Sequence, residues 1–253
     1  MEDPRNIAAT AGGPTRVERS ANIKAVVNAI NFGMFDREVT QDQGLFTSLQ
    51  GEDLQGMITD MLTLQDDKVW NGAAASLVAA DEDYCGLLTQ ITRTATVANS
   101  VTIAATIRTE VAKLAAFKDY DVKPSAIYMN PMTIDIMEQE EIALGDKEKQ
   151  YEVEVLPGIR VKGVMTVMGV LPVIADPFLA VIDDGSGHDL HKIAVVSENL
   201  LERRYIGSPV PRVFQLGRQG DLVERYVGVQ FDTFIAKAAA KGHVVITKSV
   251  NRA

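Results

Sequence analysis

The sequence is poor in cysteine, and Cys85 is its only one among 253 residues. A lone cysteine cannot form a disulfide within its own chain, which fits a reducing compartment. Cys85 lies between acidic Asp83 and an apolar run, with no Lys, Arg or His beside it. A reactive thiolate is favoured by a neighbouring cation. We therefore expect an inert, buried or half-buried thiol.

Long hydrophobic runs are also missing. No stretch reaches the roughly 18 consecutive apolar residues that suggest a transmembrane helix, so none is expected. The first residues, Met-Glu-Asp-Pro-Arg, are polar and lack the apolar core of a signal peptide. These absences predict a soluble protein made in the cytoplasm, with no membrane partner.

Basic residues are outnumbered, and the net charge is −9. Uniformly basic nucleic-acid binding is therefore not expected, because such binding neutralises phosphates with Lys and Arg. The charge is uneven: residues 36–83 hold eleven acids and two bases, whereas 202–252 hold nine bases and four acids. Two interpretations stay open: two solvated faces, or complementary surfaces that meet within the fold or between copies.

Catalytic motifs are absent from the sequence. It has no P-loop, no Gly-x-Gly-x-x-Gly, no Gly-x-Ser-x-Gly, no paired-cysteine metal site and no His-Glu-x-x-His. The best metal candidates are His188, His191, Asp183, Asp184 and Asp189. Their glycine-rich segment lacks the ligand spacing and closing Glu of a calcium loop, so a hairpin turn is favoured.

The remaining polar candidates also have plain structural interpretations. The cluster Asp81–Asp83 has no nearby acid–base partner, so a solvated loop is the default. His243 begins an apolar strand and is expected to be packed or hydrogen-bonded. Arg203 and Arg204 could bind phosphate but are favoured as interface or surface charges. We predict no catalytic residue, no cofactor and no metal, and hence no enzyme.

A helix–strand–helix unit occupies the middle of the chain, from Ser100 to Met137. Asn99 or Ser100 is expected to cap the first helix, and Ser125–Met129 is expected to form the strand. Asn130 and Pro131 then predict a second helix, with Asn as the cap and Pro in the first turn. The first helix should bury Ile103, Ile107, Val111 and Leu114, and should leave Arg108, Glu110 and Lys113 off that face.

Residues before this unit predict a loose start and a long helix. The first 20 residues suggest a flexible arm, and Ile23–Ile30 suggests a short amphipathic helix or an arm segment packed on another element. A helix is predicted from about Glu52 to Trp70, ended by Gly72 in the left-handed conformation. Its apolar stripe would be Leu54, Met57, Ile58, Met61, Leu62 and Leu64.

Residues after the unit follow a period of two, which predicts strands. Gly169–Ala175 is expected to be an edge strand because of Pro172. Phe178–Ile182 and Lys192–Val196 should be strands joined by the turn 183–189. In the β-rich tail, Val223, Val227, Val229 and Phe231 should share one strand face, and His243–Lys248 should be the last strand.

Four features in this order carry a family resemblance. They are Lys68–Gly72 (Lys-Val-Trp-Asn-Gly), the helix Ile103–Phe117 followed by Ile127–Pro131 (Ile-Tyr-Met-Asn-Pro), Gly169–Val173 (Gly-Val-Leu-Pro-Val), and the C-terminal strands Arg212–Phe234 and His243–Ser249, which are expected to close the peripheral domain. From about residue 36 onward the chain resembles the major capsid proteins of tailed double-stranded DNA bacteriophages, which have the Hong Kong 97-type fold. The resemblance implies an α+β protein that self-assembles as hexamers and pentamers into an icosahedral shell around double-stranded DNA.

The resemblance also implies a domain plan and partners. The expected parts are an N-terminal arm (1–35), a short extended loop (36–50), a peripheral domain with a long spine helix (51–83 and 197–253) and an axial domain (84–196). Portal, scaffold and decoration proteins are expected partners in the virion, and packaged DNA would be contacted without sequence specificity. The chain starts without a long charged helical leader, so either the scaffold is a separate protein or the chain is processed or truncated.

The acidic and basic segments would then meet between neighbouring subunits. Reversing Arg203, Arg204 and Arg212 to Glu is accordingly expected to impair assembly more than folding. Three alternatives remain: a nanocompartment shell of the same fold, a ring-forming connector or tail protein, and a small α/β enzyme using Asp81–Asp83 or His188–His191.

Overall fold

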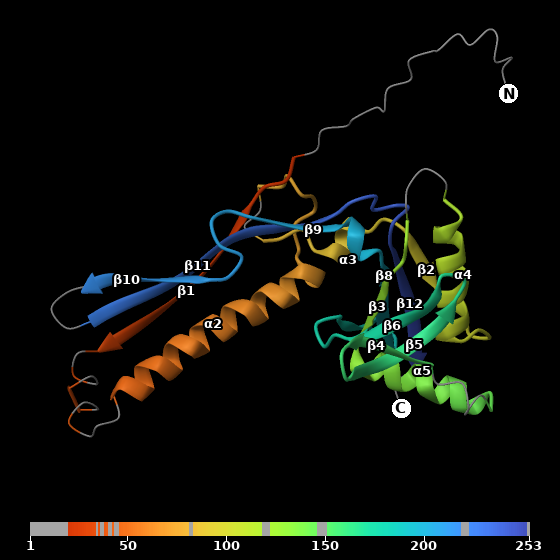
Figure 1. Cartoon of the computed structure of the whole chain (residues 1–253), viewed down its shortest axis with the longest axis horizontal. Coiled ribbons are helices and arrows are strands. Elements are labelled where there is room, and N and C mark those ends of the chain that lie inside the picture. The colour runs from red at the N-terminus through yellow and green to blue at the C-terminus, as the bar shows by residue number, and fades with distance from the viewer. Residues whose placement is uncertain are drawn as a thin grey trace, which may run out of the picture.

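The chain folds into two lobes of different shape (Figure 1). The computed structural model describes residues 20–33, 35, 38, 39, 42, 46–80, 83–117, 122–145, 151–218 and 223–251. An elongated lobe consists of one long helix and a four-stranded sheet, and a compact lobe is built around an eight-stranded sheet. This mixture confirms the predicted α+β class. Within the described ranges, no helix combines the length and hydropathy needed to cross a membrane.

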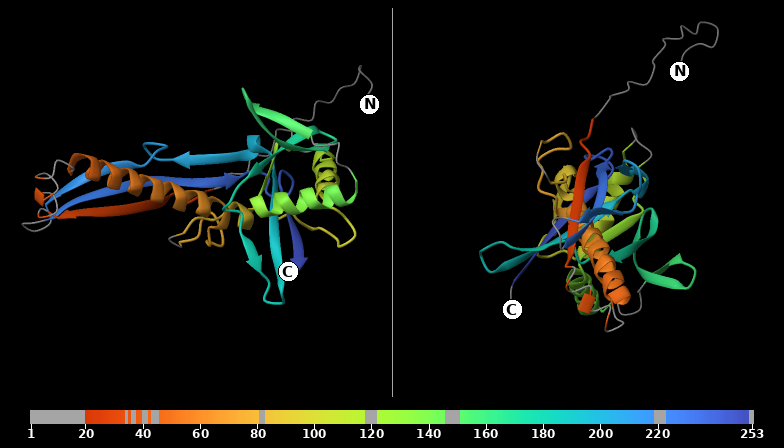
Figure 2. Two further views of the ribbon diagram at one scale, coloured as in Figure 1. Left: turned by 90° about the horizontal axis from the view of Figure 1, so that it is seen from below. Right: turned by 90° about the vertical axis from the view of Figure 1, so that its left-hand side faces the viewer.

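In the elongated lobe, helix α2 (Phe46–Asn71) runs along strands that come from both ends of the chain (Figure 2). The sheet order is β1–β11–β10, with β9 also pairing β11. The strands are β1 (Lys24–Gly33), β9 (Leu201–Tyr205), β10 (Arg212–Arg218) and β11 (Val223–Ala236).

Strand β1 corrects the helical interpretation of Ile23–Ile30. It pairs antiparallel with β11 along its whole length, from Lys24 opposite Asp232 to Gly33 opposite Val223. An extended partner from the far end of the chain decides the conformation, because strand formation depends on packing context more than on intrinsic preference. The other reading, an arm segment packed on another element, is confirmed.

Helix α2 is confirmed and begins earlier than expected, but it buries a narrower stripe. Met57, Met61 and Gln65 are buried at intervals of four residues, whereas Leu62 and Leu64 are 37% and 48% exposed. Most of the helix packs on the four-stranded sheet, and only its last turn, through Trp70, also reaches the compact lobe, so residues outside that stripe face solvent. Under the stripe, a Cβ at Gly228 would lie 2.5 Å from the Met61 sulfur, which shows how closely helix and strand approach.

Gly72 ends the helix for a different reason from the one predicted. Its φ is not among the positive values of the described glycines, so it is not a left-handed cap. Instead, a Cβ at Gly72 would lie 2.4 Å from the carbonyl oxygen of Tyr84, and one at Gly86 would lie 2.4 Å from that of Trp70. The two segments thus touch through their backbones, and Ala74 N donates to Tyr84 O at 3.0 Å.

The compact lobe has the sheet order β2–β12–β8–β3–β6–β5–β4, with β7 on β8. Its helices are α4 (Ile103–Ala115) and α5 (Pro131–Ala143), and the short α3 (Leu87–Gln90) lies between the lobes. Ile103, Ile107, Val111 and Leu114 are each 0% exposed, which confirms the predicted face of α4. The strands are β2 (Thr94–Thr96), β3 (Ala126–Met129), β4 (Tyr151–Leu156), β5 (Ile159–Thr166), β6 (Gly169–Ala175), β7 (Val181–Asp183), β8 (His188–Val196) and β12 (Val244–Asn251).

Of the two predicted helix caps, the cap of α5 is confirmed and the cap of α4 is wrong. Asn130 caps α5 as expected: its side-chain oxygen accepts from Met132 N at 3.0 Å, and Pro131 begins the helix. The cap of α4 is Thr102, which accepts from Ala105 N, and not Asn99 or Ser100.

Glu110 was expected off the buried face of α4, but only 6% of it is exposed. Its carboxylate forms ion pairs with Arg93 at 2.9 Å and Lys113 at 2.6 Å. These two cations lower the pKa of Glu110 against the opposing effect of burial, which is the largest single influence. A buried, paired carboxylate is therefore part of this helix face.

Strand β6 lies in the middle of its sheet, so the edge prediction from Pro172 is wrong. Its first half pairs with β5, as far as Gly163 opposite Pro172, and its second half pairs with β3 from Ile127 opposite Val173. Pro172 thus stands where β6 changes partners. The missing N–H of proline is tolerated there because the ladder with β3 begins only at the next residue.

Two further strands differ from expectation. The last strand, β12, was expected to close the peripheral domain, but it pairs with β8 and β2 inside the compact lobe. Strand β7 is shorter than the predicted Phe178–Ile182, because Asp176 accepts from Phe178 N at 2.9 Å and prolongs the turn. Residues 1–19 of the predicted arm lie outside the described residues, and 24–33 form β1. The predicted extended loop (36–50) is wrong at its end, because 46–50 belong to α2, and most of 36–45 lies outside the described residues.

Candidate functional site

The most distinctive surface is the side of the four-stranded sheet that faces away from α2. Alternate residues of β11, Gly228, Gln230 and Asp232, are buried toward the helix, so Val229 and Phe231 point the other way. The predicted shared face of β11 is therefore the one that the helix leaves uncovered. We call this surface the outer sheet face.

The outer sheet face is apolar and exposed. Val27 stands opposite Val229, and Phe214 opposite Val227, so they lie on the same side of the sheet. Val27 is 57% exposed, Phe214 48% and Phe231 40%. Such a group of exposed apolar side chains marks an interaction surface more often than a solvated one.

The charges on the elongated lobe divide between its two sides. Arg204 and Arg212 lie on the outer sheet face, opposite Thr233 and Val229. On the opposite side of the lobe, α2 exposes Glu52, Asp53 and Asp60. One chain thus carries a basic and an acidic surface back to back. These two surfaces do not meet within one subunit, so two interpretations stay open for them: solvated faces, or a contact between copies.

Arg203 is half-buried and makes its polar contacts within the chain, which corrects its expected interface role. It donates to the carboxylate of Asp232, which is 0% exposed, from Nε at 2.9 Å and from a terminal nitrogen at 2.8 Å. Gln230 donates to the same carboxylate at 3.1 Å, and so do the side chains of Gln65 and Tyr84. Burial and the bonded Asp232 raise the pKa of Tyr84, so its hydroxyl stays a donor.

The metal candidates lie along the hairpin of β7 and β8: Asp183 ends β7, Asp184 lies in the turn, and His188, Asp189 and His191 belong to β8. The carboxylates of Asp183 and Asp184 accept backbone N–H groups from Gly185 at 2.9 Å and Ser186 at 2.8 Å, as a turn requires. His191 is buried and bonded to Thr133 at 2.9 Å. In the part of the chain that the structure describes, no three His, Cys, Asp or Glu side chains gather as metal ligands.

The other candidate functional residues are also explained by their place in the fold. Asp81 and Glu82 lie outside the described residues, and Asp83 pairs with Lys68 at 2.8 Å. Arg204 pairs with Glu202 on the surface. Burial raises the pKa of the Cys85 thiol, as expected for an unreactive cysteine.

His243 is packed and hydrogen-bonded, as predicted. It is 0% exposed, its Nδ1 accepts from Ser197 N at 3.2 Å, and its Nε2 faces Lys237 O at 3.1 Å. A carbonyl oxygen only accepts, so Nε2 carries the proton and the ring is neutral.

We expect the stability of the fold to fall as the pH drops below about 6.5. Burial lowers the pKa of both His243 and His191 from the ordinary 6.5, so the folded state favours the neutral rings. Well above pH 6.5 the two rings are neutral in both states, so they do not make stability depend on pH. Below pH 6.5 the unfolded chain binds protons before the folded chain does, which lowers the free energy of the unfolded state and so reduces the stability of the fold. Urea unfolding midpoints should therefore decrease between pH 6.5 and about pH 5.5. A His243→Gln variant should show a smaller decrease, and an equal decrease would contradict this assignment.

Comparison with known proteins gives matches of structure only. No family model matches the sequence, and no curated protein does. The SrpI encapsulin of Synechococcus elongatus is similar with a TM-score of 0.65 and 13% identity, over 88% of this chain and 73% of that one. A chain of Gordonia phage Cozz gives 0.58 and 11%, over 99% and 79%. The capsid of Ralstonia phage GP4 gives 0.58 and 12%, over 96% and 80%. The chain therefore has the Hong Kong 97-type fold, as the resemblance implied.

Proposed function

We propose that this chain is the repeating subunit of a closed protein shell, the major capsid protein of a tailed double-stranded DNA bacteriophage. The observation that carries the proposal is the shared fold, which extends over 96–99% of this chain in the phage structures named above. The exposed apolar outer sheet face supports it, because a subunit that acts alone rarely leaves such a surface open.

The two unlike sides of the elongated lobe suit a head-to-tail contact. A surface that binds a different surface of the next copy makes a heterologous interface, which closes into a ring when the rotation fits. Phe214 and Phe231 would provide the apolar anchors, while Arg204 and Arg212 would meet acids of α2 and fix the register. Hexamers and pentamers of this kind would then form the icosahedral shell.

The remaining assignments belong to the same proposal. The domain plan is the one given above, with β12 moved to the axial part because it pairs with β8. The protein would be made in the host cytoplasm and reside in the virion with portal, scaffold and decoration proteins. A net charge of −9 agrees with contacts to packaged DNA that are few and independent of base sequence.

A second candidate function is the shell of a cellular nanocompartment. The encapsulin has the highest TM-score of the three structures named above, 0.65. The same subunit geometry would serve both shells, which differ in what they enclose. Nucleic acid inside purified particles favours the capsid, and protein cargo without nucleic acid favours the nanocompartment.

Imaging of the purified full-length chain tests the proposal. Negative-stain electron microscopy should show closed particles of uniform diameter, and the ratio of ultraviolet absorbance at the nucleic-acid and protein maxima should report their content. Discrete monomers at every protein and salt concentration would refute a shell subunit. Rings without closed particles would favour the connector or tail protein instead.

A further inference from the structure

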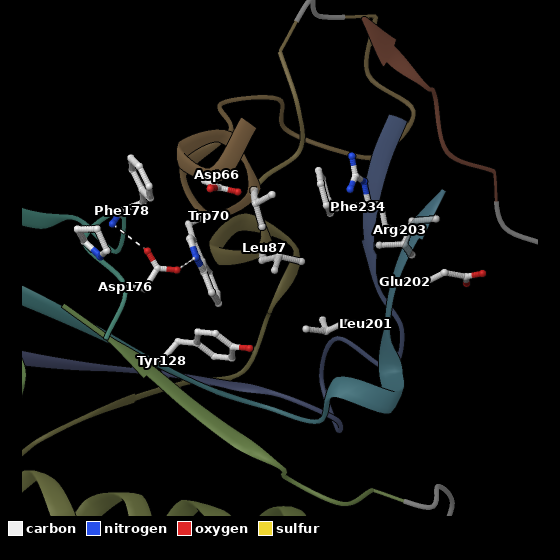
Figure 3. A pocket seen from close by; sticks show the side chains of 13 residues that line it. Asp66, Trp70, Leu87, Tyr128, Asp176, Phe178, Leu201, Glu202, Arg203 and Phe234 are labelled. Carbon is white, nitrogen blue, oxygen red and sulfur yellow. Dashed lines mark hydrogen bonds between the residues drawn. The ribbon is translucent and has the colours of Figure 1, made fainter. Parts of the chain in front are cut away.

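A pocket of about 580 Å³ opens between the two lobes (Figure 3). It lies where the last turns of α2 approach strands β3, β9 and β11 and the turn after β6, so it joins parts far apart in sequence. Its volume falls within the range of about 300–1,000 Å³ that is usual for small-molecule sites. The lining residues used below are Asp66, Trp70, Leu87, Tyr128, Asp176 and Phe234.

Most of the pocket wall is aromatic or aliphatic. The rings of Trp70 and Tyr128 are tilted against each other with centroids 5.3 Å apart. Leu87 and Phe234 also line the pocket (Figure 3). This wall suits the apolar body of a ligand, and electron-rich ring faces attract cations.

Two charged residues that line the pocket, Arg203 and Glu202, are already balanced by partners within the chain. Arg203 is balanced by the buried Asp232, and Glu202 by Arg204 and Lys237. Glu202 also points away from the other labelled side chains (Figure 3). The unbalanced charge of the pocket therefore comes from two other carboxylates.

The two carboxylates that remain are Asp66 and Asp176. Asp176 accepts from Trp70 Nε1 at 2.6 Å and from Phe178 N at 2.9 Å, which are neutral donors. Asp66 has neither a hydrogen bond nor an ion pair with any residue that the structure describes. Asp66 lies at the exposed rim of the pocket. Burial of part of its surroundings and then the charge of Asp176 raise the pKa of Asp66, and the opposing influence of Arg203 is smaller. The pocket thus has excess negative charge beside an apolar wall.

We propose that this pocket binds an organic cation with an apolar stem, of the alkylammonium or alkylguanidinium class. The stem would lie on Trp70 and Tyr128, as the methylene chains of Lys and Arg lie on apolar surfaces. The charged head would reach Asp66 and form a charge-assisted hydrogen bond. The cation could be a free amine or guanidine, or the side chain of a Lys or Arg from a second copy.

Binding can be followed by the tryptophan fluorescence of the dispersed chain, because Trp70 is the only tryptophan. Pentylammonium, an alkylammonium, should change the Trp70 emission in a saturable way, and calorimetry should give the same midpoint. Asp66→Asn should weaken binding about tenfold, the loss expected for one charge-assisted contact. The matched control Asp60→Asn changes an exposed acid of the same helix and should bind like the parent chain.

Three results would overturn the proposal: no saturable response to pentylammonium, equal affinity in Asp66→Asn, or equal affinity for uncharged n-pentanol. Assembled particles distinguish the two sources. A response that persists in particles indicates a free small cation, whereas one confined to dispersed chains indicates a side chain of a neighbouring copy. Failure to form particles would refute the proposed function without affecting the titration.

Discussion

The substitution Arg203→Glu is expected to unfold the elongated lobe. Asp232 is 0% exposed and receives two hydrogen bonds from the Arg203 guanidinium. Removing the cation leaves a buried carboxylate without its partner, which costs about 3–5 kcal/mol. The new carboxylate adds repulsion. Circular dichroism and urea unfolding of the purified chain should show loss of most of its stability.

The neighbouring residue is the matched control. The side chain of Arg204 is 65% exposed and pairs with Glu202 at the surface. Exposed pairs contribute little, so Arg204→Glu should leave the unfolding midpoint nearly unchanged. If Arg203→Glu folds normally and only fails to assemble, Arg203 is an interface residue and the internal assignment is wrong.

The double substitution Val27→Glu and Phe214→Glu is expected to abolish assembly without unfolding the subunit. Both side chains already face water in the single chain, at 57% and 48% exposure, so acids are tolerated there. In a contact between copies, the two carboxylates would be buried against an apolar or acidic surface. Loss of a buried aromatic anchor alone costs about 2 kcal/mol or more per contact. Light scattering should therefore show at least about a tenfold lower assembled fraction.

A matched change on the other lobe tests whether the effect is local. Val167 is 69% exposed in the turn between β5 and β6. The expected result is that Val167→Glu assembles and the double variant does not, while both give the circular dichroism of the parent chain. If the double variant forms normal particles, the outer sheet face is not part of the interface between copies.

Sequence patterns predicted those elements whose cause is local. Asn130 and Pro131 begin α5 because a cap side chain and a proline act within one helical turn. The buried face of α4 follows from apolar residues at helical spacing. These features need no information from the rest of the chain.

Features that depend on a distant partner were missed. Residues 24–33 are extended because β11 pairs with them, and Pro172 is central because β6 changes partners beside it. Nothing in the pair Arg203 and Arg204 shows that only one reaches a buried carboxylate. A usable signal did exist, since Gln65 continues the Met57 and Met61 spacing and so predicts a polar group inside.

The interlobe pocket could not be read from the sequence. Its wall comes from α2, α3, β3, β9, β11 and the turn after β6. No single segment contains enough of the aromatic and acidic residues to form a motif. Only the packing of the two lobes brings Trp70, Tyr128 and Asp66 together.

The placement of the last two strands has a consequence for protein synthesis. Strand β11 lies at the centre of one sheet and β12 lies between β2 and β8 in the other. While a ribosome is still making residues before Val223, neither sheet can be completed, and β1 waits unpaired for almost the whole of translation. Closing such distant contacts is slow and leaves apolar surface exposed meanwhile. A chain released before Val223 would lack β11 and with it the centre of the outer sheet face, so it could not make the contact proposed for that face.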